Sequence, residues 1–342
     1  MPSKNATSDA VRAHFRSQGQ ACARLGSPFT ARLCAVLADV LTPETPLGAR
    51  VLTWPGDPTG DALALRVCGG FQALSWEDAT LAALYPPAEI SDQFFTAGLA
   101  EWMKQNDARL VPWLAGPPQT NEVSRCSALL GGLLHIGGEI ELLEVGASAG
   151  LNLYPDRYAY DLGEGVQYGD GPVRIVTEWS GQCPPLDQPL RIVSRVGCDV
   201  APIHVADDAA RRRLRAYVWP DQPARIARFE GAVAMVADAQ PDIRKQGAAE
   251  FLRETLAPPV PEGRIRVVQH SIMWQYMPVD EQEQAEHAIR SAGARDGARL
   301  AWLRLEADDT PGSAAILLTR FPDGRTVELG RGDFHGRWVR WH

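Results

Sequence analysis

The chain has 342 residues, of which 45% are hydrophobic and 22% are charged, and its formal net charge is -8. A chain of this length and apolar content can bury a full core, as two domains or as one elaborated domain. The acidic balance argues against nucleic acid or an anionic membrane as a partner held by bulk electrostatics, because such partners favour basic surfaces. A small-molecule or protein partner is left; we predict a small-molecule substrate, and the oligomeric state stays open.

The cysteines and histidines show no spacing typical of metal sites. Six cysteines occur without a C-x-x-C pair and seven histidines without an H-E-x-x-H motif, so neither a zinc site nor a disulfide framework is indicated. No run of eighteen apolar residues occurs, and the first twenty residues are polar without the apolar core of a signal peptide. We therefore expect no metal, no membrane span and a cytoplasmic location.

Helical spacing of apolar residues dominates the chain up to about residue 138. Ser8 or Asp9 is a candidate cap for a first helix, and Pro28 opens a second, because serine, aspartate and proline are typical of helix starts. A stretch rich in Pro and Gly over 42–60 separates these segments from later ones. Further helices are predicted at 91–104 and 121–136, and residues 1–138 are predicted to form a helical N-terminal cap domain.

From residue 139 onward, strand-like runs alternate with helical ones, which is the pattern of a parallel α/β sheet. We predict a doubly wound, mostly parallel, Rossmann-like sheet over residues 139–342, with an insertion at about 154–189. The last two strands are predicted to form an antiparallel hairpin about Pro322-Asp323-Gly324. The predicted strands are 140–145, 190–196, one near Ile243, 265–270, 300–306, 314–321 and 326–329, and the predicted helices between them are 207–218, 223–237, 248–256 and 279–292.

The apolar strand at 140–145 runs into the Gly-rich turn Gly146-Ala147-Ser148-Ala149-Gly150, which fits two kinds of active site. As a cofactor loop it supplies Glu144 at the strand end and two glycines where the backbone can approach a ligand closely. As G-x-S-x-G it would present Ser148 as a nucleophile, and Asp308 or Asp309 followed by His335 would give the chain order of an α/β-hydrolase triad. The helical preceding half lacks an HGGG-like oxyanion segment, so the hydrolase is the alternative.

Two further segments are predicted to reach the same edge of the sheet. The second strand ends in Gly197-Cys198-Asp199, and an acid there suits the hydroxyls of a ribose, although Asp199 can instead cap a loop. The fourth strand leads into Gln269–Pro278, where Trp274, Gln275 and Tyr276 can contact a substrate and His270 can act as a base. The alternative is that the aromatic residues of this segment are core.

Polar residues flank the glycine turn on both sides in the sequence. Asn121 and Glu122 are predicted on the first turns of a helix that leads into the α/β domain, where they can close over the site or simply follow a cap at Thr120. Asn152 and Arg157 follow the turn directly. Arg157 either contacts substrate or forms a local ion pair with Asp156.

The acidic strand end, the glycine turn, the acid of the second strand and the final hairpin resemble a class I S-adenosylmethionine-dependent methyltransferase domain over roughly Glu139–His342. The resemblance implies that Glu144, Gly146, Ser148, Gly150 and Asn152 line a cofactor site and that Asp199 binds ribose hydroxyls. Ser148 stands where that family has its middle glycine, and Pro155 shortens the helix expected after the turn. A narrower resemblance, to the bacterial family DUF2332, is carried by Gln119–Arg125, Glu144–Leu153, Asp156–Tyr158, Gly197–Asp199, Arg215–Gln222, His270–Pro278 and His335–Val339.

The predicted function is methyl transfer from S-adenosylmethionine to an unidentified small molecule. Two alternatives stay open: a non-catalytic ligand-binding or interaction module on the same fold, and the serine hydrolase. Methyl transfer needs chiefly the alignment of the reacting atoms, so a catalytic base is optional. The predicted catalytic residues are His270, Tyr276 and Glu122, and the predicted substrate contacts are Asn121, Arg157, Trp274 and Gln275.

Overall fold

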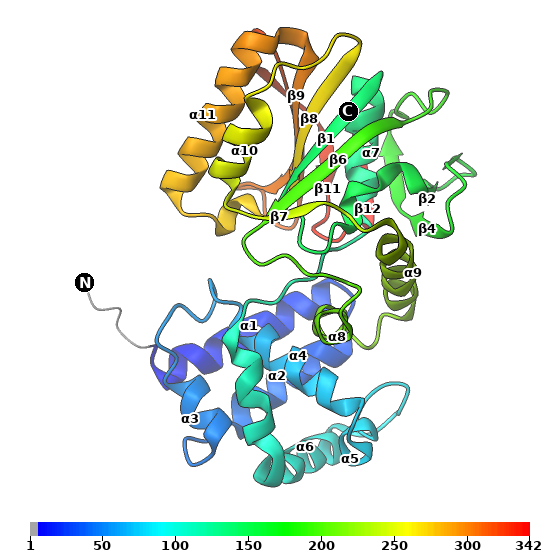
Figure 1. Ribbon diagram of the computed structural model, residues 1–342. Helices are drawn as coiled ribbons and strands as arrows, with labels where there is room; N and C mark the ends of the chain where they lie inside the picture. Colours follow the sequence, from blue (N-terminus) through cyan, green and yellow to red (C-terminus); the bar gives the residue numbers. More distant parts are fainter. Residues whose placement is uncertain (1–5) are drawn as a thin grey trace. The chain divides into compact units, whose positions relative to one another are not determined.

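The computed structural model describes residues 6–342, which divide into two compact units (Figure 1). The helical unit holds the chain up to Thr120 and, later, Asp207–Ala227. The sheet unit holds Asn121–Ala206 and Arg228–His342. No helix within residues 6–342 has the length and apolar content that a membrane crossing requires.

The helical unit packs its apolar faces around one core, which includes Phe15, Leu37, Phe71 and Phe95. Pro28 stands in the first turn of its helix, as predicted, and Ser27 caps this helix by accepting from the Thr30 amide at 3.3 Å. The cap predicted at Ser8 or Asp9 is wrong, because Thr7 caps the first helix by accepting from the Ala10 amide at 3.2 Å. The helices are α1 (Ser8–Arg24), α2 (Pro28–Val40), α3 (Pro46–Leu52), α4 (Leu63–Ser75), α5 (Ala79–Ala82), α6 (Asp92–Asn106), the 3-10 helix η1 (Asp107–Ala115) and α8 (Asp208–Arg215), with α9 (Pro223–Ala239) beginning here.

The segment 207–227 belongs to the helical unit, and its polar groups form hydrogen bonds with residues of that unit. Asp221 accepts from the Ser27 hydroxyl at 2.6 Å and from the Phe29 amide at 2.8 Å. The buried Gln72 donates to the Val218 carbonyl at 2.6 Å. The predicted boundary after residue 138 therefore differs from the observed division, which sequence order alone does not reveal.

The sheet unit is an α/β structure around one nine-stranded, mostly parallel mixed sheet. Five parallel strands run in the order β7-β6-β1-β8-β9, and β10, β11 and β12 continue the sheet as antiparallel strands. The predicted hairpin is thus part of a longer meander. The strands are β1 (Glu139–Val145), β5 (Glu178–Gly181), β6 (Arg191–Asp199), β7 (Ile243–Lys245), β8 (Arg264–Ser271), β9 (Leu300–Ala307), β10 (Ala314–Arg320), β11 (Arg325–Gly332) and β12 (Trp338–Trp341).

Helices cover both faces of this sheet (Figure 1). On one face, α10 (Ala248–Leu256) and α11 (Val279–Asp296) pack on a core that includes Leu143, Val268 and Trp302. On the other face lies α7 (Arg125–Ile136), where a Cβ atom at Gly132 would clash with Leu303. This close approach places α7 with the sheet rather than with the predicted N-terminal cap.

The predicted insertion between the first two parallel strands has structure of its own. It starts with two short 3-10 helices, η2 (Leu151–Leu153) and η3 (Pro155–Arg157), in place of a full crossover helix. A three-stranded sheet in the order β3-β2-β4 follows. Its strands are β2 (Tyr158–Asp161), β3 (Gln167–Tyr168) and β4 (Val173–Val176).

His14 caps a helix other than its own, which makes the helical unit sensitive to acid. Ala62, with φ 51°, precedes α4 without a capping side chain, and the buried His14 accepts from the Ala64 amide through Nε2 at 3.2 Å. Burial lowers the pKa of His14. Because protonated Nε2 cannot accept, the stability that neutral His14 gives is present above the ordinary histidine pKa and is lost as pH falls through the lowered one.

We expect His14→Gln to flatten this fall of unfolding free energy with acid, measured by chemical denaturation over a series of pH values. The exposed His287 supplies the control, because His287→Gln should leave the slope as it is. An unchanged slope in His14→Gln would show that the cap does not depend on this imidazole.

Candidate functional site

The turn after β1 bends through three residues in the left-handed region. Gly146, Ser148 and Gly150 have φ values of 71°, 52° and 75°. Glycine adopts such values without strain, whereas a residue with a Cβ atom does so at a cost. A Cβ atom at Gly146 would also lie 2.9 Å from Cγ of Met273. Ser148 is therefore strained at the position where the resemblance implied a glycine.

The amides of this turn are already bonded within the protein. Ala147 N–H donates to the Cys198 carbonyl at 2.9 Å, and Gly150 N–H donates to the Ala147 carbonyl at 2.7 Å. Leu151 N–H donates to Oδ1 of Asn121 at 2.9 Å. Anion sites at helix starts depend on free amides, so these bonded amides do not form one.

Asp199 lies beside the turn, as predicted, and fastens it to the end of β6. Its Oδ2 accepts from the Ser148 amide at 2.9 Å, and its Oδ1 accepts from the Ala201 amide at 2.8 Å. Each carboxylate oxygen thus has a backbone donor. The predicted contact with ribose hydroxyls would have to use the remaining lone pairs of these oxygens.

The backbone carbonyls of η2 accept hydrogen bonds from side chains, in addition to the 3-10 hydrogen bond from the Leu153 amide to the Gly150 carbonyl at 3.2 Å. The three carbonyls of Leu151–Leu153 accept, in chain order, from the Tyr158 hydroxyl at 2.6 Å, Gln269 Nε2 at 3.0 Å and Arg195 Nη1 at 3.0 Å. Asn152, predicted to contact a cofactor, is buried and accepts from Cys126 Sγ at 3.3 Å through its side chain. In this conformation Asn152 supports the turn.

Glu144 is a buried carboxyl group at the end of β1. It is 2% exposed, and burial raises its pKa well above the ordinary value, with Asp199 acting in the same direction and Arg125 opposing them. Gln269 is its partner in the register of β8, so the two side chains share one face of the sheet. The structure therefore places a buried acid with a raised pKa beside a buried amide.

Three buried polar atoms of this region have no hydrogen-bond partner within residues 6–342: Glu144 Oε2, Ser148 Oγ and Gln269 Oε1. They come from two neighbouring strand ends and the turn between β1 and η2. Each such buried atom costs about 1–3 kcal/mol of unfolding free energy when it stays unbonded. A bound polar group would remove that cost, which marks this edge as the candidate site.

His270 lies on the opposite face of the sheet from Gln269, because successive strand residues point to opposite sides. Trp302 Nε1–H donates to His270 Nε2 at 3.0 Å, and Nδ1 hydrogen-bonds Glu306 at 2.6 Å. The donation from Trp302 fixes the proton on Nδ1. Both ring nitrogens are occupied, so we do not assign His270 the role of a base.

The other predicted residues of the fourth-strand segment are spread out. Trp274 stacks on the His270 ring at 4.7 Å between centroids. Gln275 is exposed, and Tyr276 is 67% exposed. The structure therefore does not bring these three side chains to Glu144 as a group.

Glu122 and Asn121 precede α7 instead of lying on its first turns. Asn121 has φ 36°, and α7 begins at Arg125 after the N-cap residue Ser124. Glu122 is buried, accepts from the Ser124 amide at 3.2 Å, and lies 3.6 Å from Nη2 of Arg228. These contacts give both residues structural roles at the entrance to α7.

Arg157 and Asp156 do not form the predicted local ion pair. Asp156 is bidentate with Arg195 at 2.8 and 3.0 Å. Arg157 is exposed and lies over the Tyr154 ring at 5.6 Å. Arg195 reaches the carboxylate from β6 with both of its terminal nitrogens, a bidentate geometry that favours this ion pair.

The hydrolase triad is not assembled. Ser148 Oγ bonds to no base in the described chain, and Asp308 pairs with Arg331 at 2.6 and 2.9 Å, which lowers the pKa of Asp308 to about 2. A serine nucleophile needs a base within hydrogen-bond reach. This arrangement lacks that contact.

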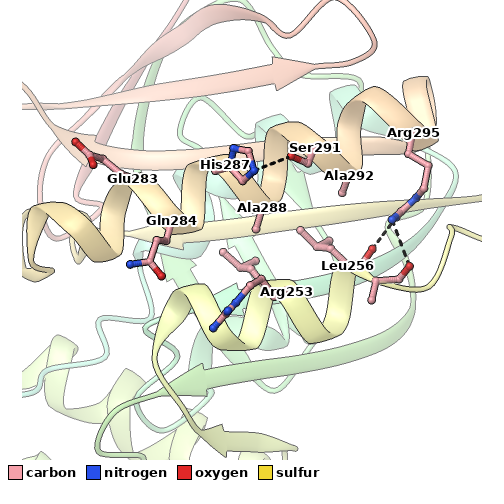
Figure 2. Close-up of a pocket in the computed structure, with 11 residues that line it drawn as sticks. Arg253, Leu256, Glu283, Gln284, His287, Ala288, Ser291, Ala292 and Arg295 are labelled. Carbon is pink, nitrogen blue, oxygen red and sulfur yellow. Dashed lines mark hydrogen bonds between the residues drawn. The ribbon is translucent and has the colours of Figure 1, made fainter.

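A groove of about 640 Å³ lies between α10 and α11 (Figure 2). Its polar groups largely bond within its own helices: Ser291 lies 3.4 Å from His287 Nε2, and Arg295 donates to the Leu256 carbonyl at 2.6 Å. None of the predicted site residues lines it. The lining residues are Leu252, Arg253, Leu256, Ala257, Glu283, Gln284, His287, Ala288, Ser291, Ala292 and Arg295.

Sequence reasoning placed the segment Gln269–Pro278 at the site but did not single out Gln269 or Met273 within it. Gln269 follows two buried valines in β8, and an amide in such a strand is a usable signal. Only the strand register shows that Gln269 lies beside Glu144. The position of Met273 on Gly146 depends on the turn after β8 and has no sequence signal.

Within residues 6–342, no three His, Cys, Asp or Glu side chains are arranged so that they could hold a metal ion.

Residues 12–341 match the model of a protein family described as an uncharacterized protein conserved in bacteria (DUF2332). Neither the curated proteins nor the solved structures contain a match to this chain.

Ser148→Gly should stabilise the protein by roughly 1 kcal/mol, because it relieves the left-handed strain and removes an unbonded hydroxyl. The measurement is the free energy of unfolding from denaturant titration. Ser271→Gly is the matched control, since Ser271 is also buried but lies in β8 and has no positive φ, so this change should destabilise. A loss of stability in Ser148→Gly would mean that the hydroxyl has a partner.

Glu144→Gln should change the pH dependence of unfolding. The raised pKa means that the folded state keeps a proton that the unfolded chain has lost, so the stability of the wild type falls as pH rises through that pKa. The neutral amide removes this slope and should leave the variant more stable at alkaline pH. Denaturation from about pH 5 to about pH 9 tests this, with the exposed Glu262→Gln as a control that keeps the slope.

Proposed function

The chain belongs to the DUF2332 family, and we propose that its sheet unit binds S-adenosylmethionine and methylates a small molecule. The observation that carries this proposal is the set of unbonded, buried atoms at the carboxyl ends of β1 and β8: Glu144 Oε2, Ser148 Oγ and Gln269 Oε1. These atoms support a hydrogen-bonding ligand at this edge of the sheet.

The strand order supports the same location. The chain runs from β1 outward to β6 and β7 and then returns to β8 on the other side of β1. Open α/β sheets bind ligands beyond the carboxyl ends of the strands at such a reversal. The glycine turn, Asp199 and Gln269 all lie at this edge.

The residues present can meet a cationic, hydroxylated ligand. Glu144 and Gln269 offer acceptor oxygens, and the Ser148 hydroxyl can donate or accept. A positive charge near Glu144 would favour its ionised form and so lower its raised pKa. When bound, S-adenosylmethionine supplies an electrophilic methyl group on a cationic sulfur.

The remaining task of the protein is alignment and exclusion of water. Asp199 keeps the turn closed against β6, and the side chains around η2 keep its backbone fixed. Holding two reactants in line supplies much of the rate increase of such a transfer. The absence of a free nitrogen on His270 therefore does not count against methyl transfer.

A second candidate is a binding module without catalysis. Both oxygens of Asp199 already accept backbone amides, and the side chain of Met273 lies on Gly146. These two contacts occupy groups that a bound S-adenosylmethionine would use, so they favour a turn that binds a ligand without catalysis.

Calorimetric titration with S-adenosylmethionine and S-adenosylhomocysteine tests the proposal. We expect binding near the micromolar range, about -8 kcal/mol, and a loss of about tenfold or more in Glu144→Ala, which removes an acceptor oxygen. The exposed Glu283→Ala is the matched control and should bind as the wild type does.

Met273→Ala is titrated in parallel because it clears the space on Gly146. Absence of binding by both the wild type and Met273→Ala would refute the cofactor. Binding without methylation of any supplied acceptor would favour the non-catalytic module.

A further inference from the structure

We propose that Met273 is a gate over the glycine turn and that Glu306 and His270 are positioning residues that hold it closed. The gate deepens the proposed function, since it rests on a ligand using the turn. Its physical state, open or closed, is measurable without any ligand.

The side chain of Met273 occupies the space that a ligand would need at Gly146. From the position of a Cβ atom on Gly146, the Cγ, Cβ and Cε atoms of Met273 lie at 2.9, 3.1 and 3.2 Å. Glycine at this position lets another group approach the backbone closely. In this structure the approaching group is the thioether side chain, which is partly buried.

A strained residue brings Met273 to this position. Ile272 has φ 50°, an outlier for a β-branched residue. Its amide donates to the Leu305 carbonyl at 2.9 Å, so the bend comes directly at the end of β8. Backbone strain of this kind costs of order 1–3 kcal/mol and persists only where surrounding contacts impose it.

Glu306 supplies the imposing contact. The amide of Met273 lies 3.2 Å from both carboxylate oxygens of Glu306. His270 orients that carboxylate through its 2.6 Å hydrogen bond, and Trp302 fixes the histidine tautomer from the other side. This gives a physical role to a buried histidine and acid that face away from Glu144.

The segment beyond Met273 combines buried and exposed side chains. Trp274 stacks on His270, but Tyr276 and Val279 are 67% and 69% exposed. Met273, Trp274 and Met277 pack on the core beneath α10 and α11, and Gln282 donates to the carbonyls of Trp274 and Met277 at 3.1 and 3.0 Å, so these contacts oppose a local opening. Opening would relieve the strain at Ile272 and break the hydrogen bonds to Glu306, so these opposing terms set the closed fraction.

The gate predicts how ligands and variants behave. A ligand that approaches Gly146 must displace Met273, and its apparent affinity is reduced by the fraction of molecules that are open. Shortening residue 273 or weakening the Glu306 contact should raise that fraction. Neither residue has to touch the ligand.

The test measures access to the turn by thiol labelling. Ser148→Cys places a reporter thiol in the turn, in a Cys183→Ser background because Cys183 is the exposed cysteine of the described chain. A small methanethiosulfonate reagent is added and labelling is followed peptide by peptide by mass spectrometry. Met273→Ala should speed labelling of the reporter about tenfold, and Glu306→Gln should speed it severalfold.

Three controls separate a gate from general loosening. Met273→Leu keeps the volume and should label as the parent does, and Met277→Ala shortens the other methionine of the segment and should also leave the rate unchanged. The buried native Cys198, in β6 beside the turn, reports wider unfolding in the same samples. A selective rise at the reporter without a rise at Cys198 supports the gate.

Equal reporter rates in the parent and Met273→Ala, within about twofold, would overturn the gate, as would an equal rise at Cys198. The calorimetric titration distinguishes this result from failure of the proposed function. Fast labelling of Met273→Ala with no binding of either adenosyl ligand leaves the gate standing and refutes the cofactor. Unchanged labelling of Met273→Ala together with micromolar binding of an adenosyl ligand supports the cofactor and refutes the gate.

Discussion

The stretch of backbone that leaves β1 without entering an α-helix is the constraint on which the candidate site depends. A crossover helix would satisfy its own carbonyls and offer free amides at its start. Here the carbonyls of η2 accept hydrogen bonds from Tyr158, Gln269 and Arg195. The amide of Leu151 donates to the side chain of Asn121. Four segments of the sheet unit therefore converge to hold one turn. The insertion and the approach to α7 are part of the site's construction for this reason.

The alternation of side chains along β8 divides the chemistry of the site between the two faces of the sheet. Gln269 lies with Glu144 on the face of α7, whereas His270 lies with Glu306 and Trp302 on the face of α10 and α11. The first pair has unbonded oxygens, and the second group is fully bonded. Met273 contacts both sides, since its amide binds Glu306 and its side chain lies on Gly146.

The edge of the sheet contains strained backbone and unbonded polar atoms, which lower the free energy of unfolding. Ser148 and Ile272 both adopt left-handed backbone, and Glu144 is a buried acid with an unbonded oxygen. Strain and unbonded polar atoms are typical of functional sites, because a ligand can relieve them. Their occurrence together at the ends of β1 and β8 agrees with a ligand site there.

The sequence by itself determined the alternating α/β elements, the parallel strands around β1 and the placement of Asp199 beside the glycine turn, since these follow from local periodicity and from the edge where parallel strands end. Only the tertiary structure decided that α7 packs on the sheet, that Asp156 pairs with Arg195, and that His270 faces away from Glu144. Strand register and long-range partners fix these features, and neither is encoded in the spacing of neighbouring residues.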